Sequence, residues 1–147
     1  MKLHSDSTPG LNRVTAYGEG YIEINRERYE GTIVFGPEGD ITALNVRNVT
    51  EITAEVLIQA AGVTPRGHDP FAALEESAGI TPVPSAAGTQ VLLVGTGRRQ
   101  QFLRSDITRE LLRAGVGVEF MDTHAAARTY NILMAEGRRV VALLLPA

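Results

Sequence analysis

The 147-residue sequence has no cysteine and no tryptophan, and only 5% of its residues are aromatic. Without cysteine, the chain can form neither disulfides nor thiolate metal sites, and it has no cysteine nucleophile. No stretch reaches the roughly 20 apolar residues that a membrane-spanning helix needs, so we expect no membrane insertion. The polar start of the chain also lacks the apolar core of a secretory signal, which favours a cytoplasmic protein.

The net charge of -3 hides an uneven distribution of charge along the chain. Residues 1–90 carry 12 acidic and 6 basic residues, whereas residues 91–147 carry 5 and 8. The basic residues of the second part are all arginines, which favour bidentate contacts with carboxylates or phosphates. A nucleic-acid-binding domain usually has a basic stripe with interleaved aromatics, so the pI near 5.6 makes nucleic acid the weakest candidate partner.

The first half of the chain predicts a group of strands followed by one helix. Four segments have a strand pattern and are predicted to form an antiparallel meander: residues 13–17, 21–24, 29–35 and 41–46. Residues 50–61 have helical spacing, with Thr50 or Thr53 as the cap and Gly62 as the end. The proline-rich residues 63–89 predict a loop, with at most one helical turn at residues 71–76.

The second half predicts a βαβαβ unit. Three apolar segments are predicted as strands: residues 91–94, 116–121 and 140–145. Between them lie a helix at residues 106–114, capped by Ser105, and a helix that begins after Asp122 or Thr123 and ends near Glu136. Helical crossovers between apolar strands indicate parallel pairing with right-handed connections. We therefore expect one α/β domain over residues 1–147, with three layers and a mixed, mostly parallel sheet extended by the amino-terminal meander.

Two loops of this unit form the candidate binding site. In open α/β sheets, ligands bind beyond the carboxyl ends of the strands, and residues 95–101 and 122–123 both follow strands there. Gly95 and Gly97 let backbone amides approach an anion, while Arg98 and Arg99 supply positive charge. The candidate ligand-binding residues are Gly95, Thr96, Gly97, Arg98, Arg99, Asp122, Thr123, Arg128 and Asn131.

Each of these features also has a purely structural interpretation. The glycine pair lacks the third glycine of a dinucleotide fingerprint and the Gly-Lys of a phosphate loop, so it can simply turn the chain. His124, Arg128 and Asn131 form a polar stripe on the last helix. That stripe either faces the crevice, where Arg128 and Asn131 could bind a ligand, or it faces solvent or packs on the meander. In the second case, which we favour, Arg128 pairs with a carboxylate such as Asp122 or Glu136.

Recognisable catalytic constellations are missing from the sequence. There is no Gly-x-Ser-x-Gly elbow and no His-Glu-x-x-His, and His4, His68 and His124 are far apart. Asp122 and Thr123 could act as base and nucleophile, but helix capping explains both. We therefore expect no cofactor and favour a protein that is not an enzyme.

Several motifs together resemble a known family: Gly-Thr-Gly-Arg-Arg-Gln at residues 95–100, and the segments at residues 117–123, 127–133 and 136–140. The chain resembles a widespread family of unknown biochemical function that includes the mitochondrial complex I (NADH:ubiquinone oxidoreductase) assembly factor 3. Residues 20–22 and the strand after them also fit, so the resemblance spans nearly the whole chain outside the proline-rich segment. It implies a single-domain, three-layer α/β fold with a mixed sheet and action through protein partners.

These observations leave two main functional hypotheses. The first is a non-catalytic interaction protein that assists assembly of a respiratory or membrane protein complex and therefore has a protein partner. The second is a small anionic-ligand binding protein, or an unrecognised enzyme, that uses the crevice between residues 95–100 and residues 122–131. The sequence leaves the oligomeric state open.

Overall fold

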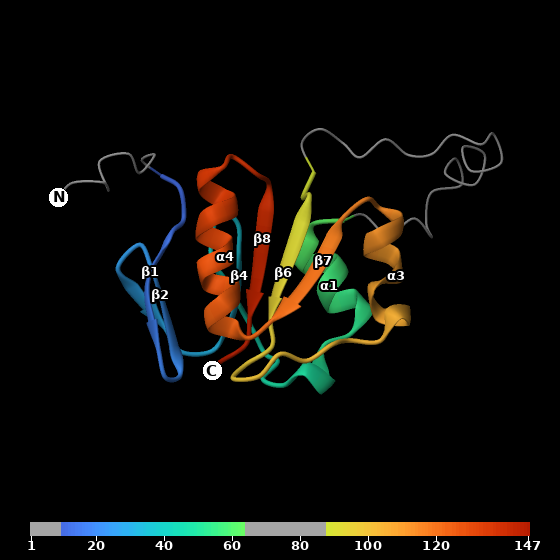
Figure 1. Ribbon diagram of the computed structural model, residues 1–147, viewed down its shortest axis with the longest axis horizontal. Helices are drawn as coiled ribbons and strands as arrows, with labels where there is room; N and C mark the ends of the chain where they lie inside the picture. Colours follow the sequence, from blue (N-terminus) through green and yellow to red (C-terminus); the bar gives the residue numbers. More distant parts are fainter. Residues whose placement is uncertain (1–9, 64–87) are drawn as a thin grey trace.

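The computed structural model describes residues 10–63 and 88–147, so the predicted helical turn at residues 71–76 lies outside the described residues. The strands are β1 (Val14–Gly18), β2 (Tyr21–Ile24), β3 (Glu27–Tyr29), β4 (Thr32–Phe35), β5 (Thr42–Leu44), β6 (Val91–Gly95), β7 (Gly117–Met121) and β8 (Val140–Leu144). The helices are η2 (Val49–Glu51), α1 (Ala54–Ala61), α3 (Ser105–Arg113) and α4 (Thr123–Ala135). Figure 1 shows their arrangement.

The described strands form two sheets. The larger sheet has the order β5-β4-β8-β6-β7, and the smaller has the order β1-β2-β3. In the larger sheet β6 pairs in parallel with both β7 and β8, while β4 pairs antiparallel with β8. The sheet is thus mixed, and the predicted parallel βαβαβ unit is confirmed.

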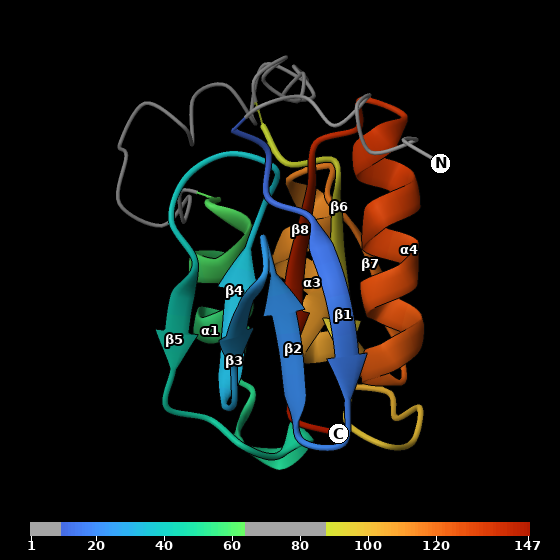
Figure 2. The same cartoon turned by 90° about the vertical axis from the view of Figure 1, so that its left-hand side faces the viewer.

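Two apolar cores separate three layers. On one face of the larger sheet, α4 and the small sheet share a core with Leu93, Tyr130 and Ala142. On the other face, α1 and α3 cover a core that includes Leu92 and Leu143. Alternate residues of β6 therefore enter different cores, as expected for a strand that is covered on both faces. Figure 2 shows the small sheet and α4 side by side on the same face of the larger sheet.

The predicted four-stranded meander is wrong in one respect. Residues 29–35 form two strands, because β3 ends at Tyr29 and β4 begins at Thr32 in the other sheet. The break falls on Glu30 and Gly31, which are both exposed. Beyond them Ile33 and Phe35 are buried, and β4 pairs with β8 instead of β3. Burial of these side chains against the larger sheet therefore outweighs continuation of the hairpin.

The helix ends follow the sequence signals with one exception. The side chain of Thr53 accepts a hydrogen bond from Val56 N–H at the start of α1, and Asp122 does the same for Ala125 N–H in α4. Ser105, the predicted cap of α3, is instead its first helical residue. The cap position belongs to Arg104, whose side chain makes no capping hydrogen bond to the described residues. Within residues 10–63 and 88–147, no helix has both the length and the apolar character required to span a membrane.

Candidate functional site

The structure brings the two candidate loops together at the carboxyl ends of β6 and β7. The Thr96 N–H donates to the Met121 carbonyl at 2.9 Å, and the Thr123 N–H donates to the Gly97 carbonyl at 2.8 Å. In return, the Gly97 N–H donates to the Thr123 hydroxyl oxygen at 2.9 Å. The loops are therefore bonded directly to each other.

The Thr123 hydroxyl joins three segments of the chain. It accepts the hydrogen bond from Gly97 and donates to the Leu145 carbonyl at 2.7 Å, and the residue is 0% exposed. The Leu145 N–H in turn donates to the Gly95 carbonyl at 2.9 Å. We call this arrangement of Gly95, Gly97, Thr123 and Leu145 the threonine clasp. The hydroxyl is thus bonded on both sides and enclosed, and it holds the three segments together.

Gly95 is required by the close approach of its neighbours. A Cβ atom on Gly95 would lie 2.9 Å from the Thr123 Cα and 2.8 Å from the Leu144 Cδ2. Real Cβ atoms essentially never approach other heavy atoms so closely, and the Thr123 backbone cannot move without displacing the start of α4. The glycine therefore allows the clasp to close.

Thr96 and Gly97 shape the rest of the loop. The Thr96 hydroxyl lies 2.6 Å from the Arg99 carbonyl and accepts a hydrogen bond from the Gln101 N–H at 3.0 Å. Gly97 has φ +97°, in the left-handed region that favours glycine. The loop is thus held by its own hydrogen bonds, while the side chains of Arg98 and Arg99 are exposed.

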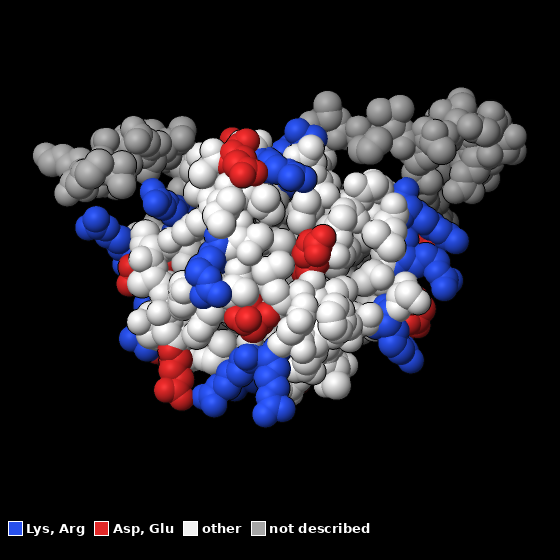
Figure 3. Space-filling view, viewed as in Figure 1, with Lys and Arg blue, Asp and Glu red and all other residues white. Residues whose placement is uncertain are grey.

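Charged side chains surround a surface pocket next to the clasp. The pocket has a volume of about 350 Å³ and is lined by Glu19, Gly97, Arg98, Asp122, His124 and Ala147. The Arg98 Nη2 donates to the Glu19 Oε1 at 2.8 Å, and both side chains are exposed to solvent. Figure 3 shows basic side chains gathered at this lower end of the molecule, with acidic side chains beside them. The pocket therefore has mixed charge.

The amino-terminal part of the α4 stripe faces the small sheet. The Arg128 Nη1 donates to the Tyr17 hydroxyl at 2.7 Å, and the His124 ring lies 4.6 Å from the Tyr17 ring. The His124 Nε2 lies 3.1 Å from the Gly18 carbonyl oxygen. Hydrogen bonding to Tyr17 raises the pKa of Arg128, so the guanidinium stays charged. The expected pairing of Arg128 with a carboxylate is wrong, because within residues 10–63 and 88–147 its hydrogen bond goes to a phenol.

Asn131 attaches β1 to α4. Its amide donates to the Val14 carbonyl at 2.8 Å and accepts from the Val14 N–H at 2.9 Å. The neighbouring Tyr130 hydroxyl donates to the Asn12 carbonyl at 2.7 Å. The structure thus places Asn131 and Arg128 along β1, and the charge of Asp122 contributes to the raised pKa of Arg128.

Sequence reasoning did not select Glu19 or His124, although both line the pocket. Glu19 lies in the turn between β1 and β2, 79 residues before its partner Arg98. No spacing rule connects two such distant residues. His124 was part of the recognised helix stripe, and its position directly after the Asp122–Thr123 loop was the available signal.

The comparisons with known proteins agree with this architecture. A family model described as a protein of unknown function (DUF498/DUF598) matches residues 14–145. The chain belongs to this family. The DUF498 match runs from the first residue of β1 to the residue after β8, and it includes both loops of the clasp.

Relatives of this DUF498 chain include complex I assembly factors. The NADH dehydrogenase [ubiquinone] 1 alpha subcomplex assembly factor 3 of Xenopus tropicalis is 28% identical over 145 residues, which is 99% of this chain and 66% of that protein. The Danio rerio protein of the same name is 40% identical over 57 residues, 39% of this chain and 33% of that protein. The chain therefore matches between one third and two thirds of the length of these relatives.

A solved structure shows the same fold. The solution structure of a Bordetella pertussis protein, described as a Mth938-like domain, is 55% identical and superposes with a TM-score of 0.76. The match covers 99% of this chain and 92% of that one. The mixed α/β fold of the DUF498 chain is thus shared with a close relative.

Proposed function

We propose that this chain is a non-catalytic assembly factor that binds a protein partner during formation of a respiratory or other membrane protein complex. The observation that carries the proposal is the threonine clasp. The Thr123 hydroxyl, which could have served as a nucleophile, and the N–H groups of Thr96, Gly97 and Thr123 are bonded within the protein. What remains at this end of the sheet is an outer surface of mixed charge, which suits the polar rim of a protein interface.

Two further observations support this proposal. Relatives that match this chain carry the name of complex I assembly factors. The two sheets also share one apolar core, since Val14 and Ile22 of the small sheet pack in the same cluster as Leu144. We therefore include in the proposal that residues 1–147 form one domain, which would present a single rigid surface to its partner.

The test is deletion of the gene in its host, followed by native gel electrophoresis of the respiratory complexes. We expect complex I to decrease and its assembly intermediates to accumulate, and we expect the tagged chain to crosslink to those intermediates. Arg98→Glu should weaken the crosslink, whereas Arg138→Glu, an equal charge change at the other end of β8, should not. Unchanged levels of every respiratory complex after deletion would contradict the proposal.

A second candidate function is binding of a small anionic ligand in the 350 Å³ pocket, favoured by Arg98 and His124 at its wall. It ranks second because the carboxylates of Glu19 and Asp122 line the same pocket and repel an anion. A ligand at 100 times its dissociation constant adds about 2.7 kcal/mol to the free energy of unfolding. A thermal-shift screen of anionic metabolites should therefore detect it, and Arg98→Ala should abolish the shift.

A further inference from the structure

The strand β7 lies at one end of the five-stranded sheet, and among the described strands it pairs only with β6. In a parallel pair, the N–H and C=O of a residue point to the same neighbour, and alternate residues point to opposite sides. The Gly117 N–H and the Met121 C=O both bond toward β6. Val118 and Phe120 therefore direct their backbone groups outward, where no strand within residues 10–63 and 88–147 pairs with them.

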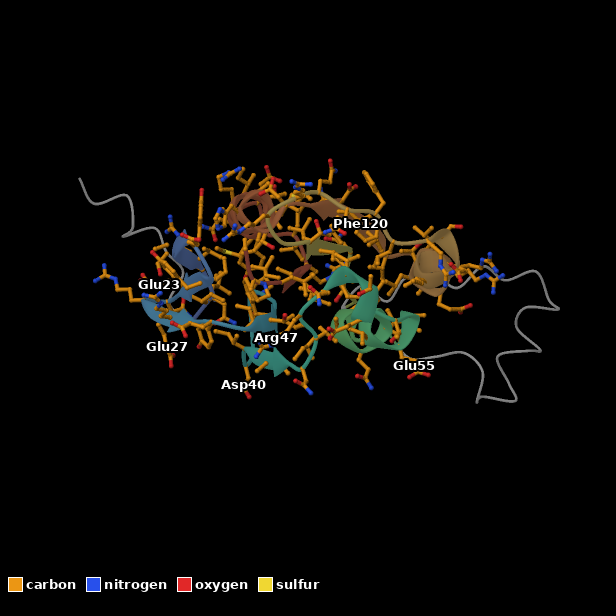
Figure 4. All side chains as sticks on the ribbon, turned by 90° about the horizontal axis from the view of Figure 1, so that it is seen from below. Glu23, Glu27, Asp40, Arg47, Glu55 and Phe120 are labelled. Atoms are coloured by element: carbon orange, nitrogen blue, oxygen red, sulfur yellow. The ribbon has the colours of Figure 1, made fainter. Side chains whose placement is uncertain are left out.

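The side chains along this edge alternate in character. Val118 and Phe120 lie on the α1 and α3 side of the sheet, where both contact the second core. Phe102 is 72% exposed and lies edge to face with Phe120 at a centroid distance of 6.0 Å. Glu119 is exposed, and strand alternation places its side chain on the opposite side. Figure 4 shows Phe120 well away from Glu23 and Glu27 of the small sheet.

This edge has little of the protection that exposed strands usually have. Edge strands are commonly kept short, or carry prolines, bulges or several charges, because these features prevent pairing with other chains. The opposite edge of the sheet, β5, has three residues, whereas β7 has five, with a regular register and Glu119 as its single charge. The side-chain amide of Gln100 donates a hydrogen bond to the Phe120 carbonyl at 2.9 Å, at one end of the strand.

We propose that β7 receives an extended segment of the partner protein, which adds to the sheet as a further strand. The segment has a basic residue opposite Glu119, between two apolar residues that pack on Val118, Phe120 and Phe102. Backbone hydrogen bonds to the edge supply affinity, and the alternating side chains supply specificity. This inference rests on the proposed assembly function and adds to the mixed-charge surface beside the clasp a second surface through which the chain contacts its partner.

A second copy of the chain fits this edge less well. Glu119 is the central residue of β7, so a symmetric antiparallel pair of β7 strands would place the two Glu119 carboxylates directly opposite each other. Like charges at directly opposite positions destabilise a strand pair. The charge of the edge therefore favours a different chain with a basic residue at that position.

The test uses the full chain, labelled with ¹⁵N, and a short capped peptide that alternates valine and lysine. We expect the peptide to slow hydrogen exchange of the Val118 and Phe120 amides by about tenfold or more. The same peptide with alternate amides methylated keeps its side chains but cannot pair, so it should give no protection. Glu119→Lys should transfer the preference to a peptide that alternates valine and glutamate. Glu136→Lys, the same charge change beyond the end of α4, should leave the preference unchanged.

The outcomes separate this inference from the proposed function. Absence of protection by the unmethylated peptides, or equal binding of the methylated ones, would overturn strand addition. A dimer that becomes a monomer on Val118→Pro would assign the edge to a second copy and also overturn it. Proline at position 118 removes an outward N–H and leaves the bonds to β6 in place, so the variant should fold. If Val118→Pro preserves complex I assembly in the host while deletion abolishes it, the assembly function stands and the edge proposal fails.

Discussion

Replacement of Thr123 by valine tests whether the threonine clasp holds the two loops together. Valine keeps the branched shape of threonine but removes the hydroxyl, so the Gly97 N–H and the Leu145 carbonyl both lose a partner. A buried backbone group left without a partner costs about 1–3 kcal/mol. Two such groups, less about 1 kcal/mol recovered from the added methyl group, give an expected loss of about 1–5 kcal/mol. The upper part of this range is a large part of the stability of a typical domain.

The assay is urea denaturation followed by far-ultraviolet circular dichroism. Thr123→Val should lower the denaturation midpoint and leave the slope unchanged, because the folded and unfolded surfaces stay similar. Thr123→Ser is the matched control: it keeps the hydroxyl and loses one methyl group, so we expect a loss of about 1 kcal/mol. If Thr123→Val and Thr123→Ser lower the denaturation midpoint equally, the hydroxyl does not hold the loops together. Thr123 is then again a candidate for chemistry.

Three further predictions concern the clasp and the contacts that α4 makes with the segment at residues 12–14. Gly95→Ala forces a methyl group against the backbone of α4, and we expect urea denaturation to show a loss of about 1–3 kcal/mol. Asn131→Asp keeps the acceptor for the Val14 N–H but loses the donor, so hydrogen exchange of the β1 amides should accelerate; unchanged exchange would refute the attachment. Tyr130→Phe removes the hydrogen bond to Asn12 and should cost about 1 kcal/mol. Burial raises the pKa of Tyr130 above its usual 10.0, so its contribution to the free energy of unfolding is complete below pH 10 and is lost as the pH rises above it. In a denaturation series at alkaline pH, Tyr130→Phe should therefore cost less stability than at neutral pH.

The parallel part of the fold was predictable because its signals are local. Apolar runs in β6 and β8, a helix stripe between them and glycines after each helix all indicate the same arrangement. The division of residues 29–35 between two sheets was not predictable. Tyr29 and Thr32 both fit a strand, and the choice of partner for each strand depends on burial against β8, which lies more than 100 residues later. The local sequence pattern predicts a strand but does not predict which strand it pairs with in a sheet.

The candidate site shows the same limit. The topology placed the loops of residues 95–101 and 122–123 at one edge, as expected from parallel strands that share an edge. The sequence did not show that Thr123 would use its hydroxyl on Gly97 and on a carbonyl 22 residues later. Likewise, Arg128 was expected to pair with a carboxylate such as Asp122 or Glu136, but it contacts Tyr17, 111 residues away. Hydrogen bonds over such separations follow from the packed fold and have no local signature.

The position of α4 explains why the clasp and the small sheet act together. Its first turn is held by the Asp122 cap and the Thr123 hydroxyl, and its middle is held to β1 by Asn131. The exposed pair of Arg98 and Glu19 spans the two regions that α4 already fixes, and exposed ion pairs contribute about 0–1 kcal/mol. The pair is therefore not needed to hold the fold. Arg98→Ala should leave the urea midpoint almost unchanged, so any loss of partner binding in that variant must come from recognition at the surface.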